Sequence, residues 1–116
     1  MDSTAAIDVL GALAQPTRLA AFRLLVEHAP DGLAAGEIAR RLDVPQNTLS
    51  THLGLLSAAG LVQARRDGRS IVYRAAIETL QALTLYLLKD CCRGRAEVCA
   101  PVVADLLSCC PTDTRQ

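Results

Sequence analysis

The sequence predicts a mainly α fold of the winged helix-turn-helix class: four helices, a β-hairpin, a fifth helix and a short C-terminal helix, assembled as a homodimer. Two short helical patterns in the first half of the chain are separated by a brief turn, as in a helix-turn-helix unit. The period then changes from helical to alternating around an Asp-Gly pair, which is typical of a hairpin. Residues 76–89 are apolar nearly all round, as expected of a helix that is covered on every face.

The first two helices follow from apolar residues at helical spacing. We expect the first to end near Gln15, with an apolar stripe of Ile7, Leu10, Leu13 and Ala14. Pro16 suits the first turn of the second helix, whose predicted buried stripe is Leu19, Phe22, Leu25 and Val26. The turn signal "APDG" at 29–32 ends this helix.

The next two helices form the predicted helix-turn-helix. The third spans about 34–42 and points Ile38, Ala39 and Leu42 inward. A short turn leads to Pro45, which is well placed to open the fourth helix, and Gly60 is the expected C-terminal cap after Ala59.

The hairpin follows directly. Val62 and Ala64 alternate with polar neighbours, Asp67-Gly68 is the expected turn, and Ile71 and Tyr73 alternate on the returning strand. A helix-turn-helix followed by such a hairpin is a winged helix.

The helix over 76–89 predicts a dimer. One small domain does not cover both faces of a terminal helix, so a second copy is expected to cover the rest; a central core helix in a monomer is the alternative. A last short helix begins at Pro101. We therefore expect a DNA-binding and dimerisation domain over 1–89 and a cysteine-rich sensing segment over 90–116.

Composition sets the broad class. At 116 residues with 51% hydrophobic and 3% aromatic side chains, the chain is one domain with an aliphatic core. Its acidic N-terminus lacks the basic region and apolar run of a signal peptide, and no stretch reaches the length of a membrane span. We expect a cytoplasmic protein without a membrane partner. The net charge is zero, but residues 40–74 carry six arginines against two aspartates, which predicts a phosphate-binding region there.

The fourth helix has a face suited to DNA. On a helical wheel Leu49, Leu53 and Leu56 share one side, and the opposite side carries Asn47, Thr51 and Gly54 with Ser50 at its edge. Short polar side chains on a helix without Lys or Glu can enter a major groove and contact base edges. An ordinary solvated face is the alternative, although such faces usually carry Lys and Glu.

Three arginines flank the hairpin turn. Arg65, Arg66 and Arg69 are placed to bind phosphate or to enter the adjacent minor groove. The alternative is a hairpin tip that is charged only for solubility.

The segments "ALAQPTRLAAFRLLVE" and "GEIARRLDVPQNTLSTHLGLLSAAGLVQARRDGRSIVYRA" resemble the ArsR/SmtB family of metal-responsive bacterial repressors, over roughly residues 7–88. The resemblance implies a homodimer that binds double-stranded operator DNA until an inducer weakens the complex. It also implies a DNA-reading segment at Gln46, Asn47, Ser50, Thr51 and His52.

The inducer sites best known in that family are missing. Where many members that sense arsenic or cadmium carry Cys-Val-Cys on the third helix, this chain has "GLAAGEIA", and no histidine follows His52 to build the family's zinc site on the last helix. All five cysteines instead lie in the last 26 residues, at Cys91, Cys92, Cys99, Cys109 and Cys110.

These thiols are the remaining candidates for a sensor. Cys91, Cys92 and Cys99 could give the three thiolates that suit As(III) or Sb(III), with no organic cofactor, and an organoarsenical would need only two. Because adjacent residues of a helix point about 100° apart, we expect a non-helical loop over 91–99. Cys109 or Cys110 could complete a zinc site or serve as small hydrophobes.

Three other functions stay open. A repressor that senses oxidant or sulfide through a cysteine pair would use the same residues. A thiol oxidoreductase is disfavoured, because Glu97 stands where the phosphate-loop type needs arginine and no Cys-x-x-Cys lies near a βαβ unit. A winged helix that binds protein would not need the neutral polar face. We expect a DNA-binding regulator and not an enzyme.

Overall fold

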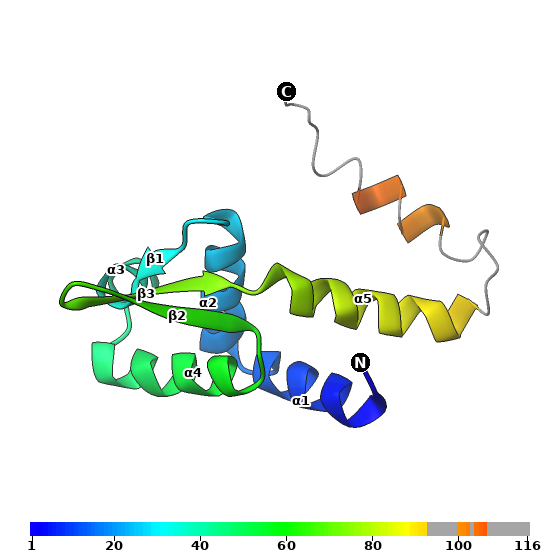
Figure 1. The fold of residues 1–116 in the computed structure, drawn as a ribbon, viewed down its shortest axis with the longest axis horizontal. Helices are drawn as coiled ribbons and strands as arrows, with labels where there is room; N and C mark the ends of the chain where they lie inside the picture. The colour runs from blue at the N-terminus through cyan, green and yellow to red at the C-terminus, as the bar shows by residue number, and fades with distance from the viewer. Residues whose placement is uncertain (93–99, 103, 107–116) are drawn as a thin grey trace. The chain divides into compact units, whose positions relative to one another are not determined.

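The computed structural model describes residues 1–92, 100–102 and 104–106. The chain divides into two compact units, Met1–Leu83 and Thr84–Gln116. The first unit contains the helix-turn-helix and the hairpin (Figure 1). The fifth helix crosses the boundary between the units, and the domain division expected after residue 89 stays a prediction.

The first two helices, α1 (Ser3–Leu13) and α2 (Pro16–Glu27), begin at side-chain caps. Asp2 Oδ1 accepts from the Ala5 N–H at 2.8 Å, and Gln15 Oε1 accepts from the Arg18 N–H at 2.9 Å. Both acceptors satisfy N–H groups that lack a partner in the first helical turn. Pro16 at the first position of α2 is confirmed.

The apolar stripe expected on α1 is not the face that the chain buries, and the burial predicted for α2 is partly wrong. Ala6 and Val9 are the buried residues of α1, whereas Ile7 is 64% exposed and Leu10 is also exposed. On α2, Phe22 and Leu25 are buried as expected, but Leu19 and Val26 are exposed. Apolar side chains occur on more than one face of each helix, so periodicity alone did not identify the face that contacts the rest of the chain.

The helix-turn-helix consists of α3 (Ala35–Leu42) and α4 (Gln46–Ala58). Asp43 between them adopts the left-handed conformation at φ 56°, and Gly60 after α4 does so at φ 80°, as expected of helix C-terminal caps. The predicted inner side of α4 is confirmed, because Leu49, Leu53 and Leu56 are fully buried.

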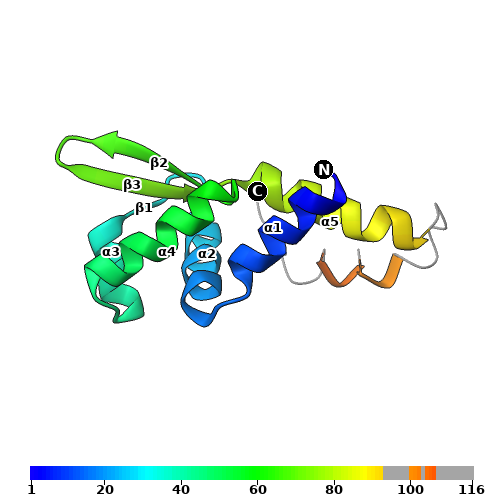
Figure 2. The ribbon, with the colours of Figure 1, turned by 90° about the horizontal axis from the view of Figure 1, so that it is seen from below.

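A three-stranded antiparallel sheet completes the wing, in the order β1-β3-β2. Strands β2 (Val62–Asp67) and β3 (Ser70–Ala75) form the predicted hairpin, which extends beyond the helices as a wing (Figure 2). Asp67 pairs with Ser70, so the two loop residues are Gly68 and Arg69 rather than Asp67 and Gly68.

The third strand, β1 (Leu33–Ala34), was not predicted, because two residues are too few to show alternation. It pairs Leu33 with Tyr73. Gly32, just before it, has φ +84°, and a Cβ there would lie 2.2 Å from the Tyr73 carbonyl oxygen. Only glycine fits so close to the neighbouring strand.

Helix α5 runs Ile77–Cys92. Near its start the Thr79 hydroxyl donates to the Gly60 carbonyl oxygen at 2.6 Å, which ties α5 to the turn after α4, and Leu83 is buried. The backbone is still helical at Cys91 and Cys92, so the expectation of a non-helical loop beginning at residue 91 is wrong.

Residues 100–102 and 104–106 are helical, in the region of the predicted C-terminal helix. Among the described residues no single helix has the length and apolar composition to cross a membrane. Taken together α1 and α2 would have both, but the pair is bent by 99°.

Candidate nucleic-acid interface

The outer face of α4 has the composition that the sequence predicted. Gln46, Asn47, Ser50 and Thr51 are exposed, and Asn47 and Thr51 lie opposite the fully buried leucines. Gly54 is also exposed, and a Cβ added there would meet nothing within 4 Å. This helix can therefore approach another surface closely without displacing side chains of its own chain.

Two of these side chains make local hydrogen bonds. Asn47 Oδ1 accepts from the Thr48 N–H at 2.9 Å, and the Thr51 hydroxyl donates to the Asn47 carbonyl oxygen at 3.5 Å. The Asn47 amide group therefore keeps its N–H donors, and the Thr51 oxygen keeps its acceptor lone pairs. Both kinds of group recognise base edges.

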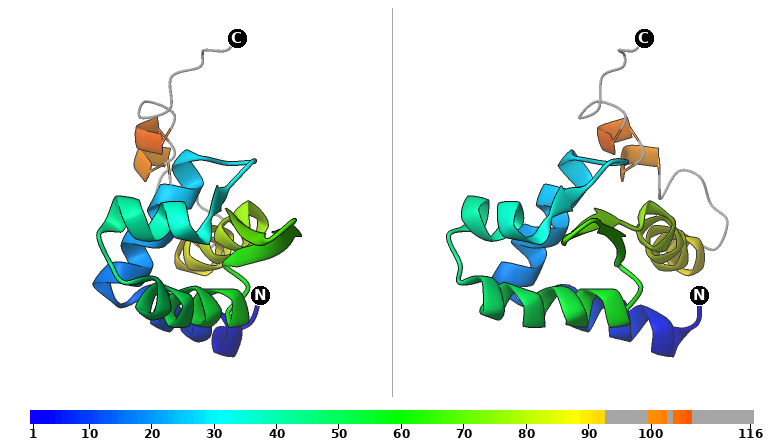
Figure 3. Two further views of the ribbon diagram at one scale, coloured as in Figure 1. Left: turned by 90° about the vertical axis from the view of Figure 1, so that its left-hand side faces the viewer. Right: turned by 60° about the vertical axis from the view of Figure 1, so that its left-hand side comes forward.

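The arginines of the wing are exposed to solvent. Arg65, Arg66 and Arg69 are exposed, and Arg69 lies in the hairpin loop. Successive strand residues point to opposite faces, so Arg65 and Arg66 serve different faces of the wing. The hairpin tip and the N-terminal end of α4 lie at the same end of the first unit in Figure 1, the end that faces the viewer in the left panel of Figure 3.

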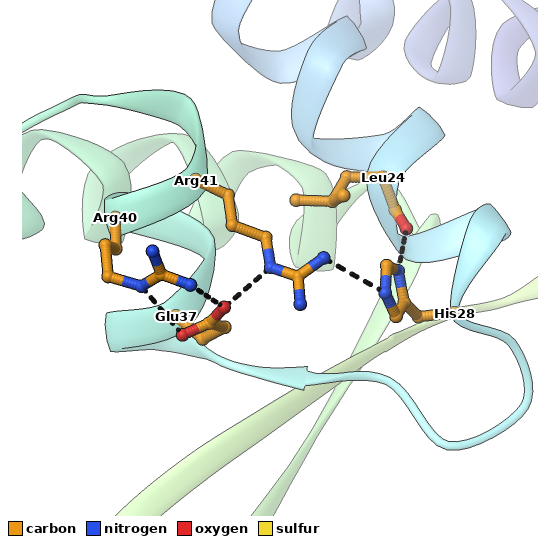
Figure 4. A network of polar contacts seen from close by, with 5 residues as sticks. All are labelled: Leu24, His28, Glu37, Arg40 and Arg41. Atoms are coloured by element: carbon orange, nitrogen blue, oxygen red, sulfur yellow. Dashed lines mark hydrogen bonds and ion pairs between the residues drawn. The ribbon is translucent and has the colours of Figure 1, made fainter.

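Two other arginines of the basic region form ion pairs within α3. Glu37 forms ion pairs with Arg40 and Arg41, and hydrogen bonds from Arg40 first and Arg41 second lower the pKa of Glu37 to about 2. Arg41 also contacts His28 Nε2 at 3.1 Å, which links α3 to the end of α2 (Figure 4). Glu37 was outside the stretch whose charge predicted a phosphate site. Glu37 offsets one of these two positive charges, so the three exposed arginines of the wing are the larger group available for phosphate.

Sequence reasoning missed one residue next to α4. Arg18, half-buried in the first turn of α2, donates from Nε to the Ala12 carbonyl oxygen at 2.6 Å. Its Nη1 lies 3.3 Å from Nδ1 of His52, a half-buried residue of α4. The contact joins residues 34 positions apart, so no local pattern reveals it. The segment "PTRL" had shown only that a helix begins there.

The predicted thiol site stays a prediction. Cys99, Cys109 and Cys110 lie outside the described residues, and of Cys91 and Cys92 only the helical backbone is described. Among the side chains that the structure describes, no three His, Cys, Asp or Glu residues are grouped so that they could hold a metal ion.

Residues 13–63 match the model of a helix-turn-helix domain family. The chain is 41% identical over 68 residues to the biofilm growth-associated repressor of Agrobacterium fabrum, which covers 59% of this chain and 56% of that protein. It is 37% identical over 81 residues to the HTH-type transcriptional repressor SmtB of Mycobacterium tuberculosis, covering 70% and 58%. The matches thus span a little over half the length of these two relatives.

Solved structures of similar proteins have the same fold. An ArsR-like transcriptional regulator from Rhodococcus sp. RHA1 superposes with a TM-score of 0.65 at 28% identity, over 94% of this chain and 95% of that one. A possible transcriptional regulator for arsenical resistance gives 0.61 at 31% identity, over 69% and 80%. Reduced HlyU from Vibrio cholerae gives 0.60 at 30% identity, over 76% and 88%. The predictions of a winged helix-turn-helix and of a regulator rather than an enzyme are confirmed.

Proposed function

Because the chain belongs to the ArsR/SmtB family of helix-turn-helix transcriptional regulators, we propose that it is a cytoplasmic, homodimeric repressor of double-stranded operator DNA. We further propose that trivalent arsenic, as arsenite or an organoarsenical, or trivalent antimony, as antimonite, releases it from that DNA by binding C-terminal thiolates. The observation that carries DNA binding is the outer face of α4, where short polar side chains and Gly54 oppose three fully buried leucines.

Exposed apolar residues on α1 support the dimer. Ile7 is 64% and Leu10 is 43% exposed, and Ile77 at the start of α5 is 41% exposed. Adjacent apolar side chains exposed on one helix favour association, because burying them removes apolar area from water. A two-fold dimer would place two copies of α4 in successive major grooves about 34 Å apart.

The thiols supply the inducer site in this proposal. Two neighbouring residues of a helix diverge by about 100°, and α5 is helical at Cys91 and Cys92. An ion that binds both of these thiolates together with Cys99 therefore requires the last turn of α5 to unwind. Unwinding next to the predicted dimer helix would change how the two subunits meet and hence the spacing of the two α4 helices.

The test of DNA binding uses two duplexes of equal length. One carries paired half-sites selected from a random pool by the protein, and the other carries the same half-sites moved apart by five base pairs. A dimer that reads successive grooves should bind the first much more tightly, since five base pairs is about half a helical turn. Equal binding to both duplexes, or to neither, contradicts the proposed function.

A thiol-based redox or sulfide-responsive repressor is the second candidate. It is favoured by the adjacent Cys91 and Cys92 and by the similarity to a solved structure described as reduced HlyU. Adding arsenite, antimonite, phenylarsine oxide, peroxide or polysulfide in turn to the DNA-bound protein separates the candidates. Release by the arsenicals alone supports the first proposal, and release by peroxide or polysulfide alone supports the second.

A further inference from the structure

Arg18 joins three helices through three hydrogen bonds. Its backbone N–H is capped by Gln15 at the start of α2, its Nε donates to the carbonyl oxygen of Ala12 in the last turn of α1, and its Nη1 contacts His52 on α4. The Ala12 carbonyl is one of the four at a helix C-terminus that lack an intrahelical partner. Gln15 therefore fixes the backbone of Arg18, and Ala12 fixes the guanidinium that contacts His52.

This contact fixes the tautomer of His52. A guanidinium only donates hydrogen bonds, so in this contact Nδ1 of His52 accepts and the ring proton lies on Nε2. Within the described part of the chain no hydrogen bond is formed to Nε2. His52 therefore has one N–H donor available on the flank of α4, directly after Thr51.

The second histidine of the chain has the opposite arrangement. His28 Nδ1 lies 3.0 Å from the Leu24 carbonyl oxygen, which only accepts, so this nitrogen carries the proton. Its Nε2 then accepts from Arg41 at 3.1 Å (Figure 4). The two contacts thus favour different tautomers at the two histidines, and each histidine serves as a control for the other.

Arg18 also borders an open part of the surface. A surface groove of about 400 Å³ lies between α1 and α4, and its lining includes Arg18, Leu55 and Ala59. Leu55 is 48% exposed there. Of the side-chain hydrogen bonds in the described part of the chain, the contact with Arg18 is the one that involves the half-buried His52 ring, so it is the interaction that orients this ring.

We propose that Arg18 is a positioning residue for DNA binding: it holds His52 in the orientation and tautomer in which the Nε2–H donates to a phosphate oxygen beside the groove that α4 reads. Arg18 itself does not touch the DNA. This inference rests on the proposed function, since it assigns a role within the same DNA complex. A phosphate contact next to the reading face fixes the register of the helix on the duplex.

The first test is the tautomer of both histidines in the free protein, measured from the imidazole ¹⁵N shifts. We expect His52 protonated on Nε2 and His28 on Nδ1. Arg18→Met, which keeps the length of the side chain but removes its donors, should give a tautomer mixture at His52 and leave His28 unchanged. A wild-type His52 protonated on Nδ1, or a His52 unaffected by Arg18→Met, would overturn the proposal.

The second test is a double-mutant cycle on operator affinity. Arg18→Met should weaken binding about 5- to 10-fold, the fold-change of one hydrogen bond, but change it less than about 2-fold in the His52→Ala background. Because Arg18 does not touch the DNA in this proposal, Arg18→Met should leave the salt slope unchanged. A slope lower by about one would mean that Arg18 itself binds phosphate and would overturn the proposal.

Two further variants distinguish a positioning role of Arg18 from a general loss of folding or of positive charge. His52→Gln places an amide donor near the position of Nε2, so Arg18→Met/His52→Gln should bind more tightly than Arg18→Met/His52→Ala. Arg23→Met removes an exposed arginine of the same helix and serves as the charge control. If the effects of Arg18→Met and His52→Ala on operator affinity simply add, the positioning role of Arg18 is overturned, while the proposed DNA binding of the protein still stands. If wild-type protein binds no duplex, the proposed function fails, and the histidine shifts still report the Arg18 contact independently.

Discussion

At the scale of single residues, Gly54 separates the requirements of folding from those of DNA reading. It is exposed in the interior of α4 with open space around its Cα, where alanine would favour the helix by about 0.8–1.0 kcal/mol. Gly54→Ala should therefore raise the free energy of unfolding by up to about that amount and yet weaken operator binding, because a methyl group would stand between the helix and the bases. Chemical denaturation and a binding titration measure the two effects.

Gly11→Ala is the matched control for this prediction. Gly11 is also an exposed helical glycine with nothing within 4 Å of an added Cβ, but it lies on α1. It should give a similar gain in stability without the loss in DNA affinity. If Gly54→Ala binds operator as well as wild type does, α4 does not lie close against the bases.

Substitutions of residues that contact bases and of residues that contact phosphates should have different effects on DNA binding. Ser50→Ala and Thr51→Ala remove hydroxyls on the outer face of α4, so each should reduce discrimination between operator and unrelated DNA. Arg65→Ala or Arg69→Ala should weaken binding to all sequences and lower the salt slope by about one, because a phosphate contact is lost. Titrations at several salt concentrations measure both, and wing variants that keep the wild-type slope would contradict this assignment.

At the scale of elements, the Glu37 ion pairs make the stability of α3 depend on pH. The pKa of Glu37 falls from 4.5 to about 2 in the folded protein, so the carboxylate stabilises the fold above about pH 4.5, and this contribution is lost as the pH falls towards 2. Glu37→Gln should flatten the pH dependence of unfolding in that window. Arg40→Gln combined with Arg41→Gln should flatten it too, and an unchanged curve in both variants would contradict the pairing.

Elements with one clear pattern were predicted well from the sequence. On α4 the apolar stripe Leu49, Leu53 and Leu56 has no competing apolar face, and the hairpin has a strong turn signal. On α1 both Ile7 with Leu10 and Ala6 with Val9 are apolar, and spacing does not tell which pair the chain itself buries. The link from Arg18 to His52 depends on tertiary packing between residues far apart in sequence, which no local pattern contains.

At the scale of the whole molecule, the exposed apolar face of α1 should contribute to the dimer together with α5, the predicted dimer helix. Ile7→Glu combined with Leu10→Glu should give folded monomers with weakened operator binding, because both side chains are exposed in the single chain. Leu83 is buried, so Leu83→Glu would unfold the chain and would not test association. Analytical ultracentrifugation with circular dichroism checks the prediction.

The exposed Leu19 on α2 provides the control for that experiment. Leu19→Glu introduces one charge at an exposed apolar position of another helix and should leave the protein dimeric. A wild-type protein that is a folded monomer at micromolar concentration would contradict the dimer proposal outright.

The central claim, that C-terminal thiols control DNA binding, is tested most directly by arsenite-induced release of labelled operator from cysteine variants. Wild type should lose about 100-fold in operator affinity, which corresponds to about 2.7 kcal/mol of coupling. Cys91→Ser, Cys92→Ser and Cys99→Ser should each bind operator almost normally and fail to respond, whereas Cys109→Ser/Cys110→Ser should still be released. If the 109/110 double variant is the one that stops responding, or if no cysteine variant alters the release, the account is contradicted.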